Sequence, residues 1–202
     1  MPSPAQVCLV RHGETDWNIS GVLQGWIDVP LNATGRQQSR ALGAAYAGVG
    51  FTAVWTSPLS RAAETAQIVA KVLGLAPPTC HEGLKERRFG AIQGVPKAEL
   101  AELNPVLMQQ LSRRNPAAAF AEGEAMDEFA DRVLNALRDI GTRHAAERVL
   151  VVTHGWVMDV ITREIQRLPR HAILNLKRKN GEGIWLESDG SGIRPGTAPR
   201  GA

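Results

Sequence analysis

The sequence predicts an α/β fold, a three-layer α/β/α sandwich around a mostly parallel sheet with a small helical lid insertion. Strand-like and helix-like segments alternate along the 202 residues, which is typical of α/β layers. The run RVLVVT at 148–153 is continuously β-rich, as in a parallel strand covered on both faces. The length is enough for one sizeable core, so we expect residues 1–202 to form a single domain.

The first half of the chain contains two strand-and-helix units. Residues 6–10 form the first expected strand, and after a loop Thr34 is expected to cap a helix that runs to about residue 48. The run FTAVWTS predicts the second strand. Its last residue, Ser57, and the following Pro58 are a favoured N-cap and first helical residue, so a second helix is expected to start there.

The middle of the chain is irregular. A short strand is expected near Thr79–His81, and three prolines then divide residues 82–123 into short helical pieces. We interpret residues 82–123 as a lid inserted between the strand and the next long helix.

The last third returns to a regular pattern. Apolar residues from Met126 to Ile140 recur at helical spacing and predict a long helix with one buried face. After the strand at 148–153, HGWVMDVITREIQRL predicts another helix. Residues 189–202 are rich in Gly, Pro and Ser, which predicts a disordered tail.

Composition argues against several classes of protein. Lys and Arg total 23 against 20 Asp and Glu, a net charge of +3 without a long basic block, so nucleic-acid binding is not indicated. No stretch reaches the roughly 20 apolar residues that span a bilayer, and no basic segment precedes the first apolar run. We expect a soluble cytoplasmic protein. Cys8 and Cys80 lie in strand-like runs and are expected to be buried thiols.

Two strands end in the same way, because CLVRHG and VVTHG each place a His-Gly pair at a carboxyl end. Ligands of open α/β sheets bind at those ends, so adjacent strands would direct His12 and His154 into one pocket. Arg61 lies in the first turn of a helix, where backbone N–H groups and the helix dipole favour an anion. With Arg11 it could bind several phosphoryl oxygens, and this set therefore predicts a phosphate site.

Each of these residues also has a simpler interpretation. A histidine at a strand end is more often structural than catalytic, and a first-turn arginine is usually solvated. A metal site is a further alternative for the two histidines, but no Cys or carboxylate accompanies them at ligand-like spacing. Two flanking arginines would also repel a cation, so we expect no metal.

Four segments in this order resemble the histidine phosphatase superfamily, specifically its phosphoglycerate mutase-like branch. They are LVRHGETDWN, TSPLSRAAETA, LKERRFGAIQG and VVTHG, and the resemblance covers roughly residues 6–165. It implies the phosphoglycerate mutase-like α/β/α fold. It also implies that His12 attacks phosphorus to form a phosphohistidine while Arg11, Arg61 and His154 bind the phosphoryl oxygens.

The same resemblance places Glu86 as the acid that protonates the leaving oxygen and then deprotonates water. From the residues alone, Glu14 or Glu82 would fit equally well. Asn18 and Gln24 match family positions that approach the phosphate or the substrate, although an ordinary surface loop explains Gln24 as well.

Gly13 has a physical reason of its own. A residue without Cβ lets the backbone approach closely behind the nucleophile.

The resemblance leaves two activities open. The short lid and Gln24 in LQGW resemble broad-specificity phosphatases of this superfamily. Arg87 and Lys97 instead resemble mutase positions that bind a second acidic group. Five further basic residues could add anion contacts or be solvated, and we favour solvation: Arg113, Arg114, Lys177, Arg178 and Lys179.

We therefore expect a phosphomonoesterase that acts on a small phosphorylated metabolite and needs no cofactor. The first alternative is a phosphoglycerate mutase that uses 2,3-bisphosphoglycerate, and the second is a non-catalytic phosphate-binding module. The expected partner is a small-molecule phosphate monoester, with no nucleic acid and no membrane. The sequence leaves the substrate and the oligomeric state open, a homodimer included.

Overall fold

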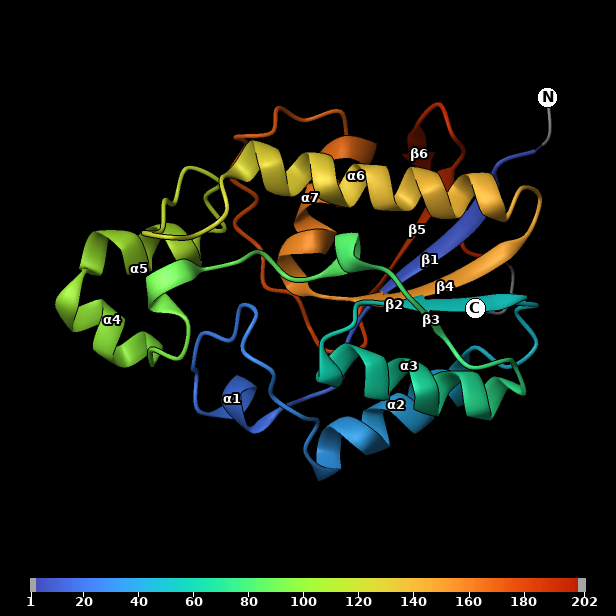
Figure 1. The fold of residues 1–202 in the computed structure, drawn as a ribbon, viewed down its shortest axis with the longest axis horizontal. Helices are drawn as coiled ribbons and strands as arrows, with labels where there is room; N and C mark the ends of the chain where they lie inside the picture. The colour runs from blue at the N-terminus through green and yellow to red at the C-terminus, as the bar shows by residue number, and fades with distance from the viewer. Residues whose placement is uncertain (1–2, 200–202) are drawn as a thin grey trace.

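In the computed structural model, which describes residues 3–199, one six-stranded sheet lies at the centre of the molecule (Figure 1). In spatial order the strands are β3 (Thr79–Cys80), β2 (Ala53–Thr56), β4 (Arg148–Thr153), β1 (Ala5–Arg11), β5 (Gly183–Ser188) and β6 (Ile193–Pro195). The first four run parallel, whereas β5 and β6 each pair antiparallel with their neighbour. The expected mostly parallel sheet is confirmed.

Helices cover both faces of this sheet and complete the three layers (Figure 1). Helices α2 (Ala33–Ala45) and α3 (Ser60–Leu73) lie on one face, and α6 (Met126–Arg143) and α7 (Gly155–Ile165) on the other. Alternate side chains of β1 enter the two cores, Cys8 and Val10 on the α3 side and Val7 and Leu9 on the α6 side. The central strands are apolar throughout because both of their faces are buried.

Two helices begin at residues other than those the sequence predicts. The cap of α2 is Asn32, whose side chain accepts from the backbone N–H of Gly35, and Thr34 already lies inside the helix. Helix α3 begins only at Ser60, whose backbone N–H donates to Asp28 from a preceding loop. Ser57 precedes the helix, and its hydroxyl accepts from the backbone N–H of Leu59 at 3.3 Å.

The expected lid, residues 82–123, is a set of short helices beside the sheet, at the left of Figure 1. It contains two 3₁₀ turns (Glu82–Leu84 and Gly90–Ile92), α4 (Lys97–Leu103) and α5 (Pro105–Ser112). Pro96 precedes the first residue of α4, and Pro105 is the first residue of α5. A single-turn helix, α1 (Asp16–Ile19), lies in the loop after β1.

Two expectations about the chain are wrong. Cys80 is exposed because β3 is a two-residue strand at the edge of the sheet, whereas Cys8 is buried as expected. Residues 189–199 are ordered, since β6 pairs with β5 and Asp189 accepts from the backbone N–H groups of Ser191 and Gly192. Residues 200–202 of the expected tail lie outside the described residues.

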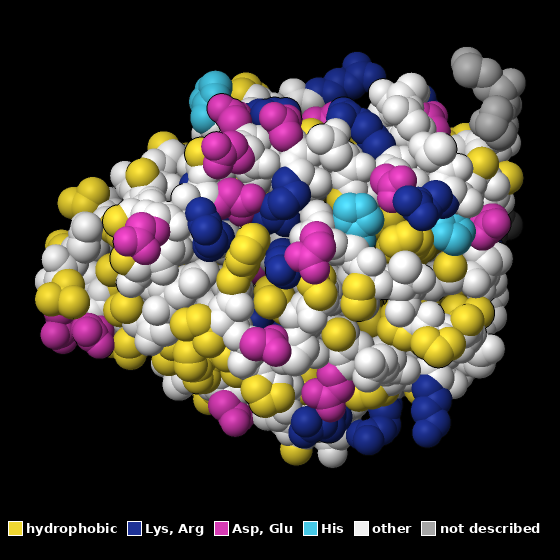
Figure 2. All heavy atoms as spheres, in the orientation of Figure 1, with side chains coloured by type: hydrophobic (Ala, Val, Ile, Leu, Met, Phe, Trp, Pro, Cys, Tyr) yellow, Lys and Arg dark blue, Asp and Glu magenta, His cyan; other side chains and the backbone are white. Residues whose placement is uncertain are grey.

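The surface mixes both signs of charge. Figure 2 shows acidic, basic and apolar side chains interspersed on the face it presents. Across residues 3–199, no helix is long and apolar enough to cross a bilayer.

Gly13 packs against the backbone at the start of α2. A Cβ at this position would lie 2.5 Å from the carbonyl oxygen of Gly35, a backbone atom that cannot rotate away. The expected reason for this glycine, a close backbone approach, is confirmed.

We predict that Gly13→Ala lowers the free energy of unfolding by about 1–3 kcal/mol, the usual cost of forcing an extra methyl group into a packed site. Urea unfolding measures the change. Gly192→Ala is the matched control, because its Cβ would meet no atom within 4 Å, and it should shift stability by less than about 0.5 kcal/mol. Equal effects of the two changes would contradict this interpretation.

Candidate active site

The sheet brings two histidines together at one edge. Strands β1 and β4 are parallel neighbours, so the residues that follow them, His12 and His154, lie side by side. Their ring centroids are 5.2 Å apart and the rings are tilted by 58°. The expectation that both imidazoles enter one site is confirmed.

The hydrogen bond of His12 determines which ring nitrogen carries a proton. Its Nδ1 lies 2.7 Å from the carbonyl oxygen of Gly13, which can only accept, so Nδ1 is protonated and Nε2 keeps its lone pair. Burial, followed by the charges of Arg61 and Arg11, holds the pKa of His12 well below 6.5. At neutral pH the ring is therefore uncharged and Nε2 is available as a nucleophile.

His154 is oriented by a residue from another strand. Its Nε2 lies 2.8 Å from the hydroxyl oxygen of Ser57, at the end of β2. Burial and the neighbouring Arg61 also hold the pKa of His154 well below its usual value. The sequence predicts Ser57 as a helix cap and not as a partner of His154, because no local pattern links two residues 97 positions apart.

Two buried arginines stand beside the histidines without a carboxylate partner. Arg61 donates to the carbonyls of Gly25 and Ile27, and Arg11 donates to the carbonyl of Arg178. Within residues 3–199, neither guanidinium has a carboxylate oxygen within 4 Å, and the Nε of each is buried without a hydrogen-bond partner. Burial lowers the pKa of Arg61 only to about 10, so its charge persists at neutral pH. Two buried guanidinium groups without a carboxylate contact favour a bound anion here.

Glu86 is the buried acid of the site. Its Oε1 accepts from the backbone N–H groups of Arg87 and of Trp156, which lies in the first turn of α7. Burial raises the pKa of Glu86, and the charge of Arg114 opposes this only in part. The carboxyl group therefore holds a proton at a higher pH than an ordinary glutamate, as a proton donor requires.

The other two acids that the sequence left open are placed differently. Glu82 is exposed and pairs with Lys85. Glu14 lines the cavity, but its carboxylate accepts from the side chain of Asn32. The structure thus favours Glu86 as the acid.

An arginine on α6 holds the backbone around Glu86. Arg132 donates to the carbonyls of Gly83, Lys85 and Glu86 and forms a two-point ion pair with Glu124. These contacts anchor the segment that carries the acid to the core helix.

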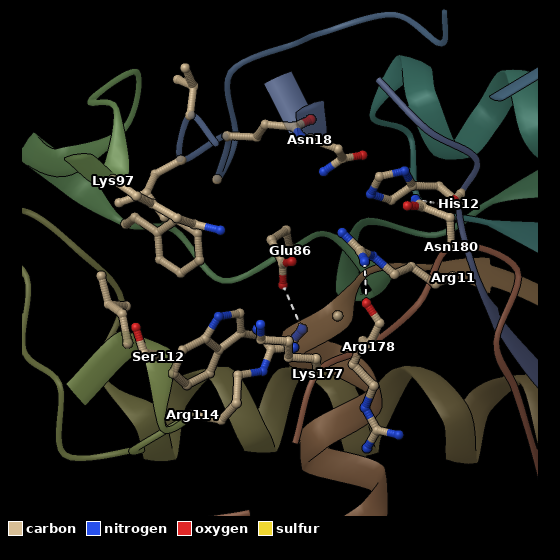
Figure 3. Close-up of a pocket in the computed structure, with 18 of the residues that line it drawn as sticks. Arg11, His12, Asn18, Glu86, Lys97, Ser112, Arg114, Lys177, Arg178 and Asn180 are labelled. Atoms are coloured by element: carbon tan, nitrogen blue, oxygen red, sulfur yellow. Dashed lines mark hydrogen bonds between the residues drawn. The ribbon is translucent and has the colours of Figure 1, made fainter. Parts of the chain in front are cut away.

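Arg11, His12, Arg61 and Glu86 line a cavity of about 530 Å³, whereas His154 lies beside His12 without lining it. Figure 3 shows Glu86 between Arg11 and His12 on one side and Lys97 and Arg114 on the other. The lining side chains come from the sheet edge, the lid and the C-terminal segment, and include Arg11, His12, Asn18, Gln24, Arg61, Glu86, Lys97, Arg114, Trp156, Lys177, Arg178 and Asn180.

The expected substrate-binding residues fall into two groups. Asn18, Gln24 and Lys97 line the cavity, whereas Gly13, which was also expected to bind substrate, does not. The side chain of Asn18 also caps α1, and that of Gln24 donates to Thr15. Arg87 does not line the cavity, because its guanidinium donates to the carbonyls of Glu124 and Ala118 and is only 2% exposed. Its position supports the lid, and the expected substrate contact is not borne out.

The favoured interpretation of five basic residues as solvated holds only in part. Arg113 and Lys179 are exposed, as expected. Arg114 and Arg178 instead form ion pairs with the fully buried Asp159 and line the cavity. Lys177 is exposed and also lines it. The partner that makes the difference, Asp159, lies far from both arginines in the sequence.

Asn180 is among the site residues that the sequence did not indicate, as are Trp156, Arg132 and Asp159. The side chain of Asn180 donates to the carbonyl of His12 at 2.7 Å and lines the cavity. It lies in an irregular segment 168 positions away, where no periodicity could reveal it. In the part of the chain that the structure describes, no three His, Cys, Asp or Glu side chains are grouped to hold a metal ion.

Comparison with known proteins agrees with this fold and site. The model of the histidine phosphatase superfamily (branch 1) matches residues 7–196, and the chain belongs to this superfamily. It is 35% identical over 159 residues to the uncharacterized phosphatase PhoE of Bacillus subtilis, covering 79% of this chain and 76% of that protein. It is 33% identical over 191 residues to the probable phosphoglycerate mutase GpmB of Yersinia enterocolitica, covering 91% and 88%.

The solved structure of Bacillus stearothermophilus YhfR has the same fold. It superposes with a TM-score of 0.85 at 32% identity, covering 98% of this chain and 96% of that one. The resemblance inferred from four sequence segments is therefore confirmed.

We predict that His12 stays uncharged, protonated on Nδ1, at about pH 6, although an ordinary histidine with a pKa of 6.5 would be mostly charged there. The ¹⁵N chemical shifts of the ring nitrogens report both charge and tautomer. The spectrum of His12→Asn assigns the signal. A charged ring at that pH would contradict the described environment.

Proposed function

We propose that the protein hydrolyses a small phosphate monoester through a phosphohistidine intermediate on His12. The observation that carries this proposal is an uncharged His12, with a free Nε2 lone pair, beside two buried arginines that lack a carboxylate partner. A phosphoryl group supplies the missing negative charge and also the electrophile.

The residues divide the reaction between them. Nε2 of His12 attacks phosphorus, and the bond from phosphorus to the leaving oxygen breaks. Arg11, Arg61 and His154 bind the phosphoryl oxygens, where charge develops during transfer. Glu86 donates its proton to the leaving oxygen, so the product departs as an alcohol.

The second half of the reaction reverses the role of the acid. Glu86, now ionised, takes a proton from water, and the oxygen of that water attacks the phosphorus of phosphohistidine. The bond from phosphorus to Nε2 breaks, inorganic phosphate leaves, and both His12 and Glu86 return to their starting states.

A second cluster of positive charge in the cavity favours a substrate that carries another acidic group besides its phosphate. Lys97, Arg114 and Lys177 line the cavity wall on the lid side of Glu86. Burial and the charges of Arg11, Arg114 and Lys177 lower the pKa of Lys97, as expected where cations converge. An anion at this end of the substrate would relieve that repulsion, so a carboxylate or second phosphate is favoured.

The same cluster supports the phosphoglycerate mutase alternative, as does the likeness to GpmB. The two activities differ in what attacks the phosphohistidine, water in the phosphatase and a second hydroxyl of the substrate in the mutase. A cytoplasmic location and a homodimer remain predictions.

Incubation with 3-phosphoglycerate, a phosphate monoester with a carboxylate, distinguishes the two activities. We predict steady release of inorganic phosphate, measured colorimetrically, with little 2-phosphoglycerate. Rapid isomerisation that depends on 2,3-bisphosphoglycerate, with little phosphate released, would instead favour the mutase. Activity on none of a broad panel of phosphate monoesters would favour the non-catalytic module.

The control for this experiment is His12→Ala. It should release no phosphate and should form no acid-labile, base-stable phosphoenzyme when quenched during turnover. Persistence of that adduct would indicate another nucleophile.

We predict that Glu86→Gln slows hydrolysis of an alkyl phosphate by about 10²–10⁴-fold, the usual contribution of a general acid, and of p-nitrophenyl phosphate much less. The aryl leaving group needs little protonation. Because burial raises the pKa of Glu86 above 4.5, the acid stays protonated above that pH, and wild-type kcat/KM for the alkyl phosphate should fall only at higher pH. That decline should be absent in the variant. Equal losses on both substrates would count against this role.

A further inference from the structure

Arg114 is held in an uncommon backbone conformation at the cavity wall. Its φ of 55° lies in the left-handed region, which residues other than glycine seldom adopt. Its guanidinium lies over the ring of Trp156, 5.1 Å from the ring centroid. Such a conformation persists only where surrounding contacts enforce it. Neighbouring residues must therefore hold Arg114 in place.

Three residues on one face of α7 contact different parts of Arg114. Gly155, Asp159 and Arg163 are spaced four apart and therefore form a stripe along the helix. Oδ2 of Asp159 lies 2.7 Å from Nε of Arg114. Nη2 of Arg163 donates to the backbone carbonyl of Arg114 at 3.0 Å. A Cβ on Gly155 would lie 2.7 Å from Nη2 of Arg114, so this glycine leaves space for the guanidinium.

We propose that Asp159 is a positioning residue, which holds Arg114 so that its Nη nitrogens face the second acidic group of the substrate. This inference rests on the proposed function. Within residues 3–199, neither Nη of Arg114 has a hydrogen-bond partner, although Arg114 lines the cavity. Asp159 pairs with the Nε side by charge, at 2.7 Å but without hydrogen-bond geometry, and so leaves the other edge of the guanidinium for a ligand.

Asp159 also counters the repulsion among the cations around it. It is fully buried between Arg114 and Arg178, at 2.7 and 2.9 Å, and Arg163 lies one turn further along α7. Lys97 and Lys177 line the cavity next to Arg114. Without the carboxylate, repulsion from these cations would push the Arg114 side chain away from the wall.

The two arginines depend on Asp159 to different degrees. Arg178 has further partners, because it donates to Glu182 at 2.6 Å, to the carbonyl of Met158 and to the hydroxyl of Thr162. In the described part of the chain, the only hydrogen-bond or ion-pair partner of the Arg114 guanidinium is Asp159. Loss of the carboxylate should therefore release Arg114 but not Arg178. The hydrogen bond from Arg11 to the carbonyl of Arg178 should then also remain.

The experiment compares wild type with Asp159→Asn on two matched substrates. 3-Phosphoglycerate has a carboxylate where glycerol 3-phosphate has a neutral CH₂OH group. We expect KM for 3-phosphoglycerate to rise about tenfold in the variant, while KM and kcat for glycerol 3-phosphate stay within about twofold. Equal changes with both substrates, or no change with either, would overturn the proposal.

Binding measurements separate this inference from the proposed function. Calorimetric titration of the two compounds into His12→Ala, with and without Asp159→Asn, needs no turnover and should show the same selective loss for 3-phosphoglycerate. If wild type hydrolyses neither compound, the proposed function fails for them while the titration still tests Asp159. If the protein with Asp159 intact binds 3-phosphoglycerate no more tightly than glycerol 3-phosphate, the proposal is wrong.

Two further variants guard against a folding artefact. Gly155→Ala displaces the Arg114 guanidinium directly, and alanine is favourable in a helix. It should raise the ratio of the two KM values in the same direction. Arg114→Gln should reproduce the selective loss, and combining it with Asp159→Asn should add little, as expected when one residue acts through the other. Additive losses would overturn the assignment, and thermal unfolding by circular dichroism confirms that each variant is folded.

Discussion

The site depends on the burial of two positive charges, Arg11 and Arg61, that no carboxylate of the described chain contacts directly. Removing a charged group from water costs several kcal/mol unless it is paired. Arg11 and Arg61 recover part of that cost from backbone carbonyls at the loop after α1 and at the C-terminal segment. Because carbonyl dipoles compensate only in part, the pocket keeps a strong preference for a bound anion.

The same burial determines the protonation states on which the chemistry depends. Low polarity and nearby arginines disfavour a charged imidazole, so His12 keeps the lone pair that a cation would lack. Burial raises the pKa of Glu86, whereas it lowers that of His12, because the charged form of a carboxyl group is the deprotonated one. One environment thus favours an uncharged His12 and a protonated Glu86, the two states that the proposed reaction requires.

Helix α7 connects the catalytic end of the cavity to the lid. Its first turn donates a backbone N–H to Glu86, and the residue before it is His154. One turn later, Asp159 binds arginines from the lid and from the C-terminal segment. The helix begins at the carboxyl end of a central strand, so one element anchored to the sheet positions groups that the lid and the C-terminal segment supply.

The sequence by itself determined the α/β order, the adjacency of His12 and His154, and the superfamily, because strand and helix periodicity and the RHG and THG motifs are local. It did not determine the helix cap at Asn32, the start of α3 at Ser60, the ordered strand near the C-terminus, or which basic residues are buried. Only the tertiary structure decided that Arg114 and Arg178 face the cavity and that Arg87 does not. Whether each arginine is buried depends on partners distant in sequence, such as Asp159 for Arg114 and Arg178. The reason is that the free-energy cost of burying a charge depends on the groups that pair with it.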